Sequence, residues 1–500
     1  MTIDAVANDV LANGHPFLDG RPKQLFIGGQ WVDALAGETF GSINPSTGER
    51  LTEVALARSA DIDRAVAAAR AAFDGPWSRF KPFDRQNLLL AIADAVERRF
   101  DELATIETLD MGAPIARTTS FKRFMLQALR FYAAQAVGIY GETVHNSVPG
   151  DMLSFTLRDP IGVVAGIIPW NGPLISQLWS IGPTLATGCT LVLKPAEDAP
   201  LSALLLAEIM QSAGLPDGVV NVVPGYGADA GARLAEHPGI DKIAFTGSTG
   251  TGRKIVQAAA GNMKRVSVEL GGKSADIVFA DADLDRAVTG AAMACFNNTG
   301  QVCYAGTRLL VQRSIHDQFV ARMAEFAGTL KVGHSMDPAT QLGPIVSHRQ
   351  LSTVLGYCDV ARSEGADIVT GGTRLAGDLA EGYFVPPTIV AGVSNQMRIA
   401  QEEIFGPVVS VIPFDTAEEA VAIANDSPYG LGGAVWTRDL ATAHRVARAV
   451  RTGMMWVNCY GVTEPAVTSE GVRMSGYGAK GGRRHIDEYL YAKSIWIRLD

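Results

Sequence analysis

Cys303 lies in a stretch of small and polar residues, NNTGQVCYAGTR, at positions 297–308. Inert buried cysteines usually lie among large aliphatic residues, whereas Asn298, Thr299 and Gly300 come shortly before this one. Two interpretations are open from this stretch alone: a buried cysteine in a tight turn, or a nucleophile on a loop that a substrate can approach closely. As a nucleophile, the thiol must be acidified by its surroundings or deprotonated by a base, because a free thiol has a pKa of about 8.5.

Polar residues also follow four apolar runs that are typical of buried strands. They are Asn171 in PWN, Lys194 and Glu197 in KPAE, Gly247 and Ser248 in TGST, and Glu269 in ELGGK. A carboxylate such as Glu269 becomes a usable general base where burial raises its pKa, although a surface glutamate at a strand end is equally compatible with the pattern. Ser248 stands where a helix begins, and free N–H groups at a helix start favour a phosphate.

The elements that must position these residues form a regular alternation. Short apolar runs predict buried strands at 163–168, 190–194, 219–223, 242–247 and 265–272. Helical patterns separate them, at 174–188, 200–214 and 249–261, and Ser202 and Gly214 match the residue preferences of helix ends. Repeated strand–helix–strand units predict a parallel sheet covered on both faces, whose ligands collect at the carboxyl ends of the strands.

Five hundred residues exceed the size of a single hydrophobic core, so two or three domains are expected. Residues 21–140 and 159–272 are predicted to form a doubly wound domain, and the alternation restarts at 275–280 to give a second α/β domain, 273–470. Segments 141–158 and 487–500 are predicted to form a β-rich arm, and residues 1–20 an N-terminal tail.

Composition excludes several classes of function. The net charge of −9 argues against nucleic-acid and anionic-membrane partners. The five cysteines are irregularly spaced and contain no CxxC pair, which is typical of reduced thiols, and no HExxH motif supports a metal site. The N-terminus has no signal-peptide pattern, and the most apolar run, 161–170, is too short to cross a bilayer. We therefore predict a soluble cytoplasmic protein.

The motifs together resemble the NAD(P)-dependent aldehyde dehydrogenase superfamily over residues 25–500. PWN, KPAE, FTGST, ELGGK, GQVCYAGTR and EEIFGPV (402–408) stand in the order and spacing of that family. The spacing between Glu269 and Cys303 is the most specific part. The resemblance implies an α/β fold with a Rossmann-like doubly wound cofactor domain, a second α/β catalytic domain and a small β oligomerisation arm.

The resemblance also implies a mechanism. Cys303 attacks an aldehyde carbonyl to form a thiohemiacetal, whose oxyanion is held by the Asn171 amide and the Cys303 backbone N–H. Transfer of a hydride to the nicotinamide leaves a thioester, and Glu269 activates the water that hydrolyses it.

By the same resemblance, seven further positions join Lys194 and Glu197 in cofactor binding. Lys194 and Glu197 are expected to hold the adenosine ribose, and Gly247 and Ser248 the pyrophosphate. A carboxylate at position 197 repels a 2′-phosphate, so NAD is favoured, with NADP possible. The groove and nicotinamide side are assigned to Ile168, Pro169, Trp170, Glu403 and Phe405.

This chain departs from the family pattern near the substrate entrance. Thr468, Ser469, Glu470 and Gly471 stand where many relatives have Pro-Phe-Gly-Gly, and Gly172 stands where an aromatic residue is common. With Trp179 and Phe296 as apolar wall residues, these changes predict a wider or more polar tunnel and a bulky aldehyde, either terpenoid, aromatic or medium-chain. Lys480 replaces a common glutamate, which leaves the secondary acid–base role of that position in doubt.

Two other functions are compatible with the scaffold. A CoA-acylating semialdehyde dehydrogenase would pass the thioester to CoA, and such relatives tend to lack the glutamate that is present here as Glu269. A non-catalytic binding or structural protein could discard Cys303, Glu269 and Asn171, yet all three are retained. The resemblance also implies a homodimer or homotetramer, assembled through the β arm.

Overall fold

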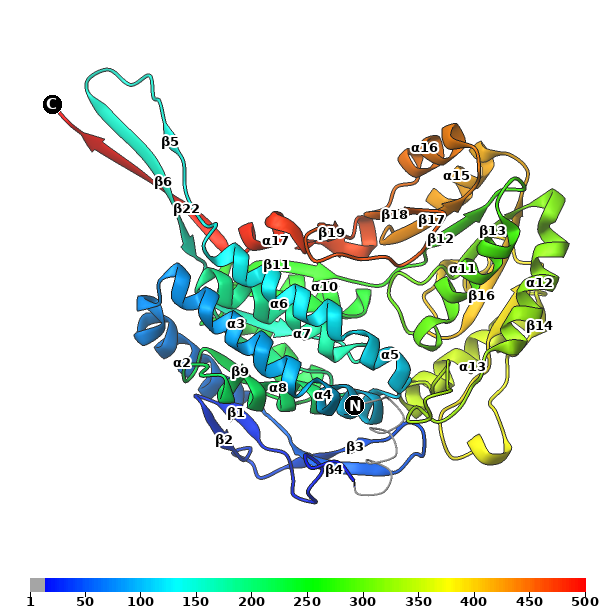
Figure 1. The fold of residues 1–500 in the computed structure, drawn as a ribbon, viewed down its shortest axis with the longest axis horizontal. Coiled ribbons are helices and arrows are strands. Elements are labelled where there is room, and N and C mark those ends of the chain that lie inside the picture. Colours follow the sequence, from blue (N-terminus) through cyan, green and yellow to red (C-terminus); the bar gives the residue numbers. More distant parts are fainter. Residues whose placement is uncertain (1–13) are drawn as a thin grey trace.

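The computed structural model describes residues 14–500, so part of the predicted tail, 1–13, lies outside the described residues. Two large mixed sheets and a narrow projecting sheet make up the architecture (Figure 1). The predicted α/β fold class is confirmed. The domain boundaries stay predictions.

The first large sheet has eight strands, with a parallel centre and an antiparallel strand beyond each end of that centre. Parallel pairing runs from β9 through β8, β7 and β10 to β11, while β1 and β20 pair antiparallel with β9 and β11. Its strand order is β2 (Gln30–Val32), β1 (Leu25–Ile27), β9 (Val220–Val222), β8 (Thr190–Lys194), β7 (Val163–Ile167), β10 (Lys242–Thr246), β11 (Arg265–Glu269) and β20 (Gly476–Tyr477).

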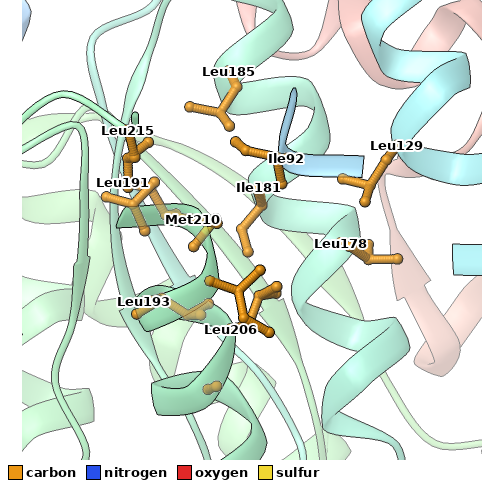
Figure 2. Close-up of a cluster of buried hydrophobic side chains, with 14 of the residues drawn as sticks. Ile92, Leu129, Leu178, Ile181, Leu185, Leu191, Leu193, Leu206, Met210 and Leu215 are labelled. Carbon is orange, nitrogen blue, oxygen red and sulfur yellow. The ribbon is translucent and has the colours of Figure 1, made fainter. Parts of the chain in front are cut away.

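Alternating strand residues bury two separate cores, one on each face of this sheet. Leu191 and Leu193 point into one core and Val192 into the other, because successive side chains of a strand face opposite ways. Figure 2 shows the larger core, where Leu191 and Leu193 meet Leu206, Met210 and other apolar side chains of the covering helices. The helices on this face are α3 (Pro82–Arg98), α4 (Phe100–Met111), α6 (Lys122–Ala136), α7 (Pro173–Thr187) and α8 (Leu201–Ser212). Helices α2 (Ser59–Asp74), α9 (Ala232–Glu236) and α10 (Thr249–Ala259) cover the other face.

The second large sheet has seven strands, and only its edge strand β14 is antiparallel to its neighbour. Its order is β14 (Asp367–Thr370), β15 (Thr388–Ala391), β16 (Val408–Phe414), β13 (Arg308–Gln312), β12 (Ala275–Val278), β17 (Gly432–Trp436) and β18 (Met454–Val457). The helices around it are α11 (Leu284–Phe296), α12 (His316–Thr329), α13 (His348–Ser363), α14 (Arg398–Gln401), α15 (Ala417–Asn425) and α16 (Leu440–Ala449).

Three strands project from the body as a long ribbon (Figure 1). β6 (Met152–Pro160) pairs antiparallel with β5 (Thr143–Val144) on one side and with β22 (Leu490–Arg498) on the other. The two segments assigned to a β-rich arm therefore lie side by side, although more than 300 positions of sequence separate them.

Three smaller groups of elements complete the fold. A separate hairpin is formed by β3 (Thr39–Ile43) and β4 (Arg50–Ala55), and β19 (Ser469–Glu470) pairs with β21 (Ala479–Lys480). Short helices are α5 (Ile115–Ser120) and α17 (Gly482–Asp487).

The predicted role of Ser202 at the start of the helix 200–214 is wrong. Ser202 lies inside α8, whose first turn makes no side-chain cap, and the Ser202 hydroxyl donates to the Glu107 carboxylate at 2.9 Å. Glu107 is buried, and such a carboxylate requires polar partners. Ser202 therefore satisfies a buried acid on the neighbouring helix α4.

Candidate active site

The carboxyl ends of β7, β10 and β11 border a cavity of about 1050 Å³ that also reaches residues of the second sheet's connections. Most of the predicted site residues line it together. They are Pro169, Trp170, Asn171, Gly247, Ser248, Glu269, Cys303, Glu403 and Phe405. Parallel strands bring distant residues to one edge in this way, because all of their carboxyl ends meet there.

Ile168, Lys194 and Glu197 do not line this cavity. The Ile168 side chain is buried in the core beneath the sheet, so only its backbone is left for a cofactor contact. Lys194 and Glu197 form an ion pair of 3.5 Å at the end of β8, and the Lys194 ammonium also donates to the Pro195 carbonyl at 2.7 Å. The adenosine-ribose role assigned to this pair stays a prediction.

The loop that carries Cys303 has an unusual backbone. Asn298, Thr299 and Gly300 have consecutive φ values of +54°, +55° and +70°. Left-handed non-glycine residues each cost about 1–3 kcal/mol and persist only where their surroundings hold them. Here the Asn298 amide donates to the carbonyls of Asn171, at 3.0 Å, and Gln301, at 3.1 Å.

A second set of bonds ties this loop to residues 343–346. The Gln301 side chain accepts from the Val346 N–H at 2.9 Å and donates to the Pro344 carbonyl at 3.3 Å. The Thr299 hydroxyl donates to the Gly343 carbonyl at 2.9 Å. The backbone on both sides of the thiol is therefore anchored before any substrate arrives.

The glycines around the loop allow backbone to pass close to backbone. A Cβ on Gly300 would lie 2.0 Å from the Gly406 carbonyl oxygen, and one on Gly272 would lie 2.6 Å from the Cys303 carbonyl oxygen. The sequence pattern suggested that small residues leave room for a substrate. At these two positions the reason is backbone packing.

Cys303 is half-buried in the cavity wall. Burial raises the pKa of its thiol to about 12, an effect that the charge of Lys480 opposes and the carboxylates Glu269 and Glu403 reinforce. In this state the group is a thiol, so its proton must leave during or before attack on a carbonyl.

Asn171 follows β7 and lies against the cysteine loop. Its side-chain amide donates to the Gln301 carbonyl at 2.9 Å, which fixes the orientation of the amide and leaves its second N–H free to donate to another acceptor. A positioned amide beside a thiol is the type of donor that stabilises an oxyanion.

Glu269 ends β11 and forms an ion pair with Lys480. Burial raises the pKa of the Glu269 carboxyl group, and the Lys480 ammonium opposes that rise. Lys480 also donates to the Thr246 hydroxyl at 3.2 Å. Sequence reasoning identified Lys480 only as a departure from a family pattern and missed its contact with Glu269.

Glu403 lies across the two glycines that follow Glu269. Its carboxylate accepts from the Gly272 N–H at 3.1 Å, and a Cβ on Gly271 would lie 2.0 Å from the carboxylate. Burial raises its pKa to about 7. Phe405 has a φ of +58° and contacts the Trp170 ring edge to face, with ring centroids 5.1 Å apart.

Ser248 caps the N-terminus of α10, where its hydroxyl accepts from the Thr251 N–H at 3.2 Å. Gly247 precedes it, and a Cβ there would lie 2.6 Å from the Phe245 ring. This helix start at the cavity wall combines free N–H groups with the positive end of the helix dipole, which suits an anionic group.

The prediction that Phe296 forms part of the tunnel wall is wrong. Phe296 is fully buried in the core beside α11 and α12, and the following residue, Asn297, lines the cavity instead. Phe296 is the last residue of α11, and the backbone leaves the helical conformation at Asn297. Trp179, Gly172, Thr468 and Ser469 line the cavity as predicted, whereas Glu470 and Gly471, assigned to the same entrance, do not.

Within residues 14–500, no group of three or more His, Cys, Asp or Glu side chains could hold a metal ion, and no helix is long and apolar enough to cross a membrane. All five cysteines are free thiols.

A thiol, an amide donor and a buried carboxylate meet at the carboxyl edge of a doubly wound α/β sheet, which is where proteins of this fold class bind their ligands. The model of the aldehyde dehydrogenase family matches residues 31–495, and the chain belongs to that family as an aldehyde dehydrogenase enzyme.

Several relatives match over nearly their whole length. The mitochondrial aldehyde dehydrogenase of Homo sapiens is 45% identical over 95% of this chain and 92% of its own. The NAD+ complex of aldehyde dehydrogenase from Bacillus cereus matches with a TM-score of 0.94 and 42% identity, over 97% of this chain and 98% of its own. Betaine aldehyde dehydrogenase from Staphylococcus aureus in complex with NAD+ matches with a TM-score of 0.95 and 37% identity, over 97% of this chain and 96% of its own.

Proposed function

We propose that this enzyme oxidises an aldehyde to the carboxylic acid with NAD, through covalent attachment of the substrate to Cys303. The observation that carries the proposal is the meeting of Cys303, Asn171 and Glu269 in one cavity. The Gln301 carbonyl holds the Asn171 amide, and Lys480 holds the Glu269 carboxylate. Family membership supplies the reaction class, and the solved NAD+ complexes of relatives support the choice of cofactor.

The residues on the cavity wall fit a dinucleotide. The N-terminus of α10 with Ser248 suits the pyrophosphate, Glu403 offers a carboxylate to ribose hydroxyls, and Trp170 and Phe405 supply aromatic faces. When bound, NAD supplies the hydride acceptor of the reaction. Glu197 at the end of β8 disfavours a 2′-phosphate, which favours NAD over NADP.

Three residues carry the steps that belong to the protein. Cys303 adds to the aldehyde carbon, and its thiol proton passes to solvent water as the C–S bond forms. The Asn171 amide and the Cys303 N–H hold the oxygen of the resulting thiohemiacetal. After oxidation to the thioester, Glu269 takes a proton from water as the water oxygen attacks, and the C–S bond breaks to release the acid and the thiolate.

The substrate is proposed to be bulky, with terpenoid, aromatic and medium-chain aldehydes as the candidates. A Cβ on Gly172 would meet nothing within 4 Å, so the position is open space in the wall. Aromatic surface is nearby in Phe121, Phe124 and Trp179, while the Arg117 guanidinium, which donates to Asn297, adds a polar patch.

The test follows NADH absorbance over a panel from acetaldehyde to geranial, benzaldehyde and octanal, with NAD and NADP compared. We expect bulky aldehydes to have the higher kcat/KM, and Gly172→Phe to reverse that order by filling the open space. A wild-type preference for acetaldehyde would contradict the substrate proposal. Acyl-CoA formed on adding CoA would favour the CoA-acylating alternative.

We also propose that the β arm joins subunits into a homodimer or homotetramer in the cytoplasm. The arm exposes apolar side chains, including Leu157, Trp496 and Ile497, and Trp496 is 53% exposed. Leu153 and Ile497 pair across β6 and β22, so their exposed side chains are neighbours, and exposed apolar surface of this kind is typical of an interface. Sedimentation of the wild type and Trp496→Asp tests this, since a charge at the interface should shift the assembly toward monomers.

A further inference from the structure

Lys480 is the cation that contacts the proposed general base, and its surroundings give it little else to bind. Its side chain is 18% exposed and that of Glu269 is 15% exposed. Within residues 14–500, Glu269 is its one carboxylate partner, and its second polar contact is the Thr246 hydroxyl at 3.2 Å. The ammonium group therefore bridges the ends of two adjacent strands, β10 and β11.

The backbone around Lys480 fixes this placement. Lys480 belongs to β21 and pairs with Ser469 of β19, while two residues of β20, Gly476 and Tyr477, pair with Glu269 and Val268 of β11. Gly478, between these strands, has a φ of +106°, and a Cβ there would lie 2.4 Å from the Ser267 side chain. Lys480 thus follows shortly after β20, which pairs antiparallel with β11, and this places its side chain beside Glu269.

A small chamber of about 20 Å³ adjoins the ion pair, with room for roughly one water molecule. Its wall includes His485, whose ring is buried and accepts from the Gly481 N–H at 3.3 Å. The Tyr132 hydroxyl lies 2.8 Å from the same ring nitrogen. Burial lowers the pKa of His485 well below its usual value, so this histidine adds no charge beside Lys480.

The other groups that act on the pair come from several elements. Glu488 acts on Glu269 and is itself paired with Lys242 at 3.2 Å. The Cys303 thiol is near both members of the pair, and Glu403 acts on that thiol. The Tyr132 and Tyr489 phenols are buried, and burial raises their pKa well above the usual value, so both are neutral. Lys480 is therefore the cation that directly opposes the charge of Glu269.

We propose that Lys480 is a positioning residue for the reaction: its ammonium group anchors Glu269 as a carboxylate beside Thr246 and places a positive charge that Cys303 also experiences. This inference rests on the proposed roles of Cys303 and Glu269. Lys480 neither gives nor takes a proton in the hydrolytic step: the proton of water goes to Glu269, and Cys303 leaves as the thiolate. Lys480 sets how much of Glu269 is ionised when that step begins.

The first experiment needs no turnover. The rate of Cys303 alkylation by iodoacetamide is followed against pH by peptide mass spectrometry, in the wild type, Glu269→Gln, and Glu269→Gln combined with Lys480→Met or Lys480→Arg. Glu269→Gln removes the negative charge and leaves the ammonium, so we expect the alkylation midpoint to move about one pH unit toward acid. In the Glu269→Gln background, Lys480→Met should abolish this acid shift of the alkylation midpoint, whereas Lys480→Arg should preserve it. Equal midpoints with lysine and with methionine would overturn the proposal.

The second experiment measures turnover. In Lys480→Met the buried Glu269 loses its counter-charge, its pKa rises further, and a smaller fraction is ionised at neutral pH. We expect the steady-state rate at pH 7 to fall about tenfold or more and to recover as pH increases, while Lys480→Arg stays within about threefold of the wild type. A pH profile of Lys480→Met that matches the wild type would also overturn the proposal.

A matched control is available in Lys264. It is a buried lysine just before the opposite end of β11, and its ammonium donates to the Ala235 and His237 carbonyls at 2.6 Å and 3.0 Å. Lys264→Met should lower the melting temperature without moving either pH profile. If none of the aldehydes tested gives NADH with the wild type, the proposed function fails. The alkylation series still decides the role of Lys480 in that case, because it needs no turnover.

Discussion

Two stretches of chain border the cavity in different ways: the cysteine loop, 297–303, and the segment 460–469 that follows β18. The cysteine loop is held by side-chain bonds from Asn298, Thr299 and Gln301, and these three residues are buried. The segment 460–469 is mostly exposed, and the Trp456 indole N–H donates to its Val462 carbonyl at 2.9 Å. The comparison teaches that several buried side chains anchor the backbone before Cys303, while the segment 460–469 leaves most of its side chains exposed.

The largest expected difference comes from the two half-buried thiols. Cys303→Ala should lower kcat by about 10⁴-fold or more, because it removes the nucleophile. Cys459→Ala, just before the segment 460–469, should leave kcat within about twofold. NADH formation under saturating aldehyde measures both. A similar loss of kcat in Cys303→Ala and Cys459→Ala would contradict the distinction between the cysteine loop and the segment 460–469.

A smaller effect is expected at the amide that joins β7 to the loop. Asn171→Ala should cost about 10²–10³ in kcat with little change in KM, because its N–H is used mainly when the oxyanion forms. Thr463→Ala on the exposed segment serves as the control and should be nearly silent. A rise in KM alone for Asn171→Ala would mean that the amide binds substrate without stabilising the reaction.

Two glycines sharpen the contrast in stability. Gly300 and Gly461 have φ values of +70° and +72°, but a Cβ would lie 2.0 Å from a carbonyl oxygen at Gly300 and 3.6 Å from the nearest atom, in Tyr304, at Gly461. In both alanine variants the left-handed backbone lowers the free energy of unfolding by about 1 kcal/mol. Only Gly300→Ala must also displace neighbouring backbone, so its total loss should be about 3 kcal/mol. Urea unfolding measures the difference, and equal losses would show that the loop yields easily.

The smallest effect should come from the variable wall. Val462→Ala removes two methyl-sized groups from an exposed position that lines the cavity, so kcat/KM for bulky aldehydes should fall about threefold while acetaldehyde is unaffected. The ratio of the two kcat/KM values is the measurement. An equal loss for both aldehydes would place Val462 among the residues that support the chemistry.

Local patterns predicted the strands of the first sheet well, because a fully buried parallel strand is a short apolar run. The predicted strand 190–194 agrees with β8 residue for residue, whereas 265–272 is too long because the backbone leaves the sheet after Glu269 to pass beneath Glu403. The pairing of β20 with β11 had no local signal, since two residues are too few to show a period.

Motifs predicted most of the residues that line the cavity, but they did not predict contacts between residues far apart in the chain. Cys303, Asn171 and Glu269 are recognisable from motifs. The contact of Lys480 with Glu269 and the bond of Ser202 to Glu107 depend on the packing of elements far apart in the chain. Phe296 and Asn297 differ by one position at a helix end, which is within the uncertainty of any such boundary.

The pairing of Gly476 with Glu269 has a consequence for biosynthesis. When the ribosome has made β7 to β11, the edge strand that ends at Glu269 still lacks its neighbour β20, and about 200 more residues must be translated before that neighbour exists. The edge of β11 that ends at Glu269 is therefore covered only late in synthesis, and a chain that stopped shortly before residue 470 would lack both β20 and the lysine that pairs with Glu269.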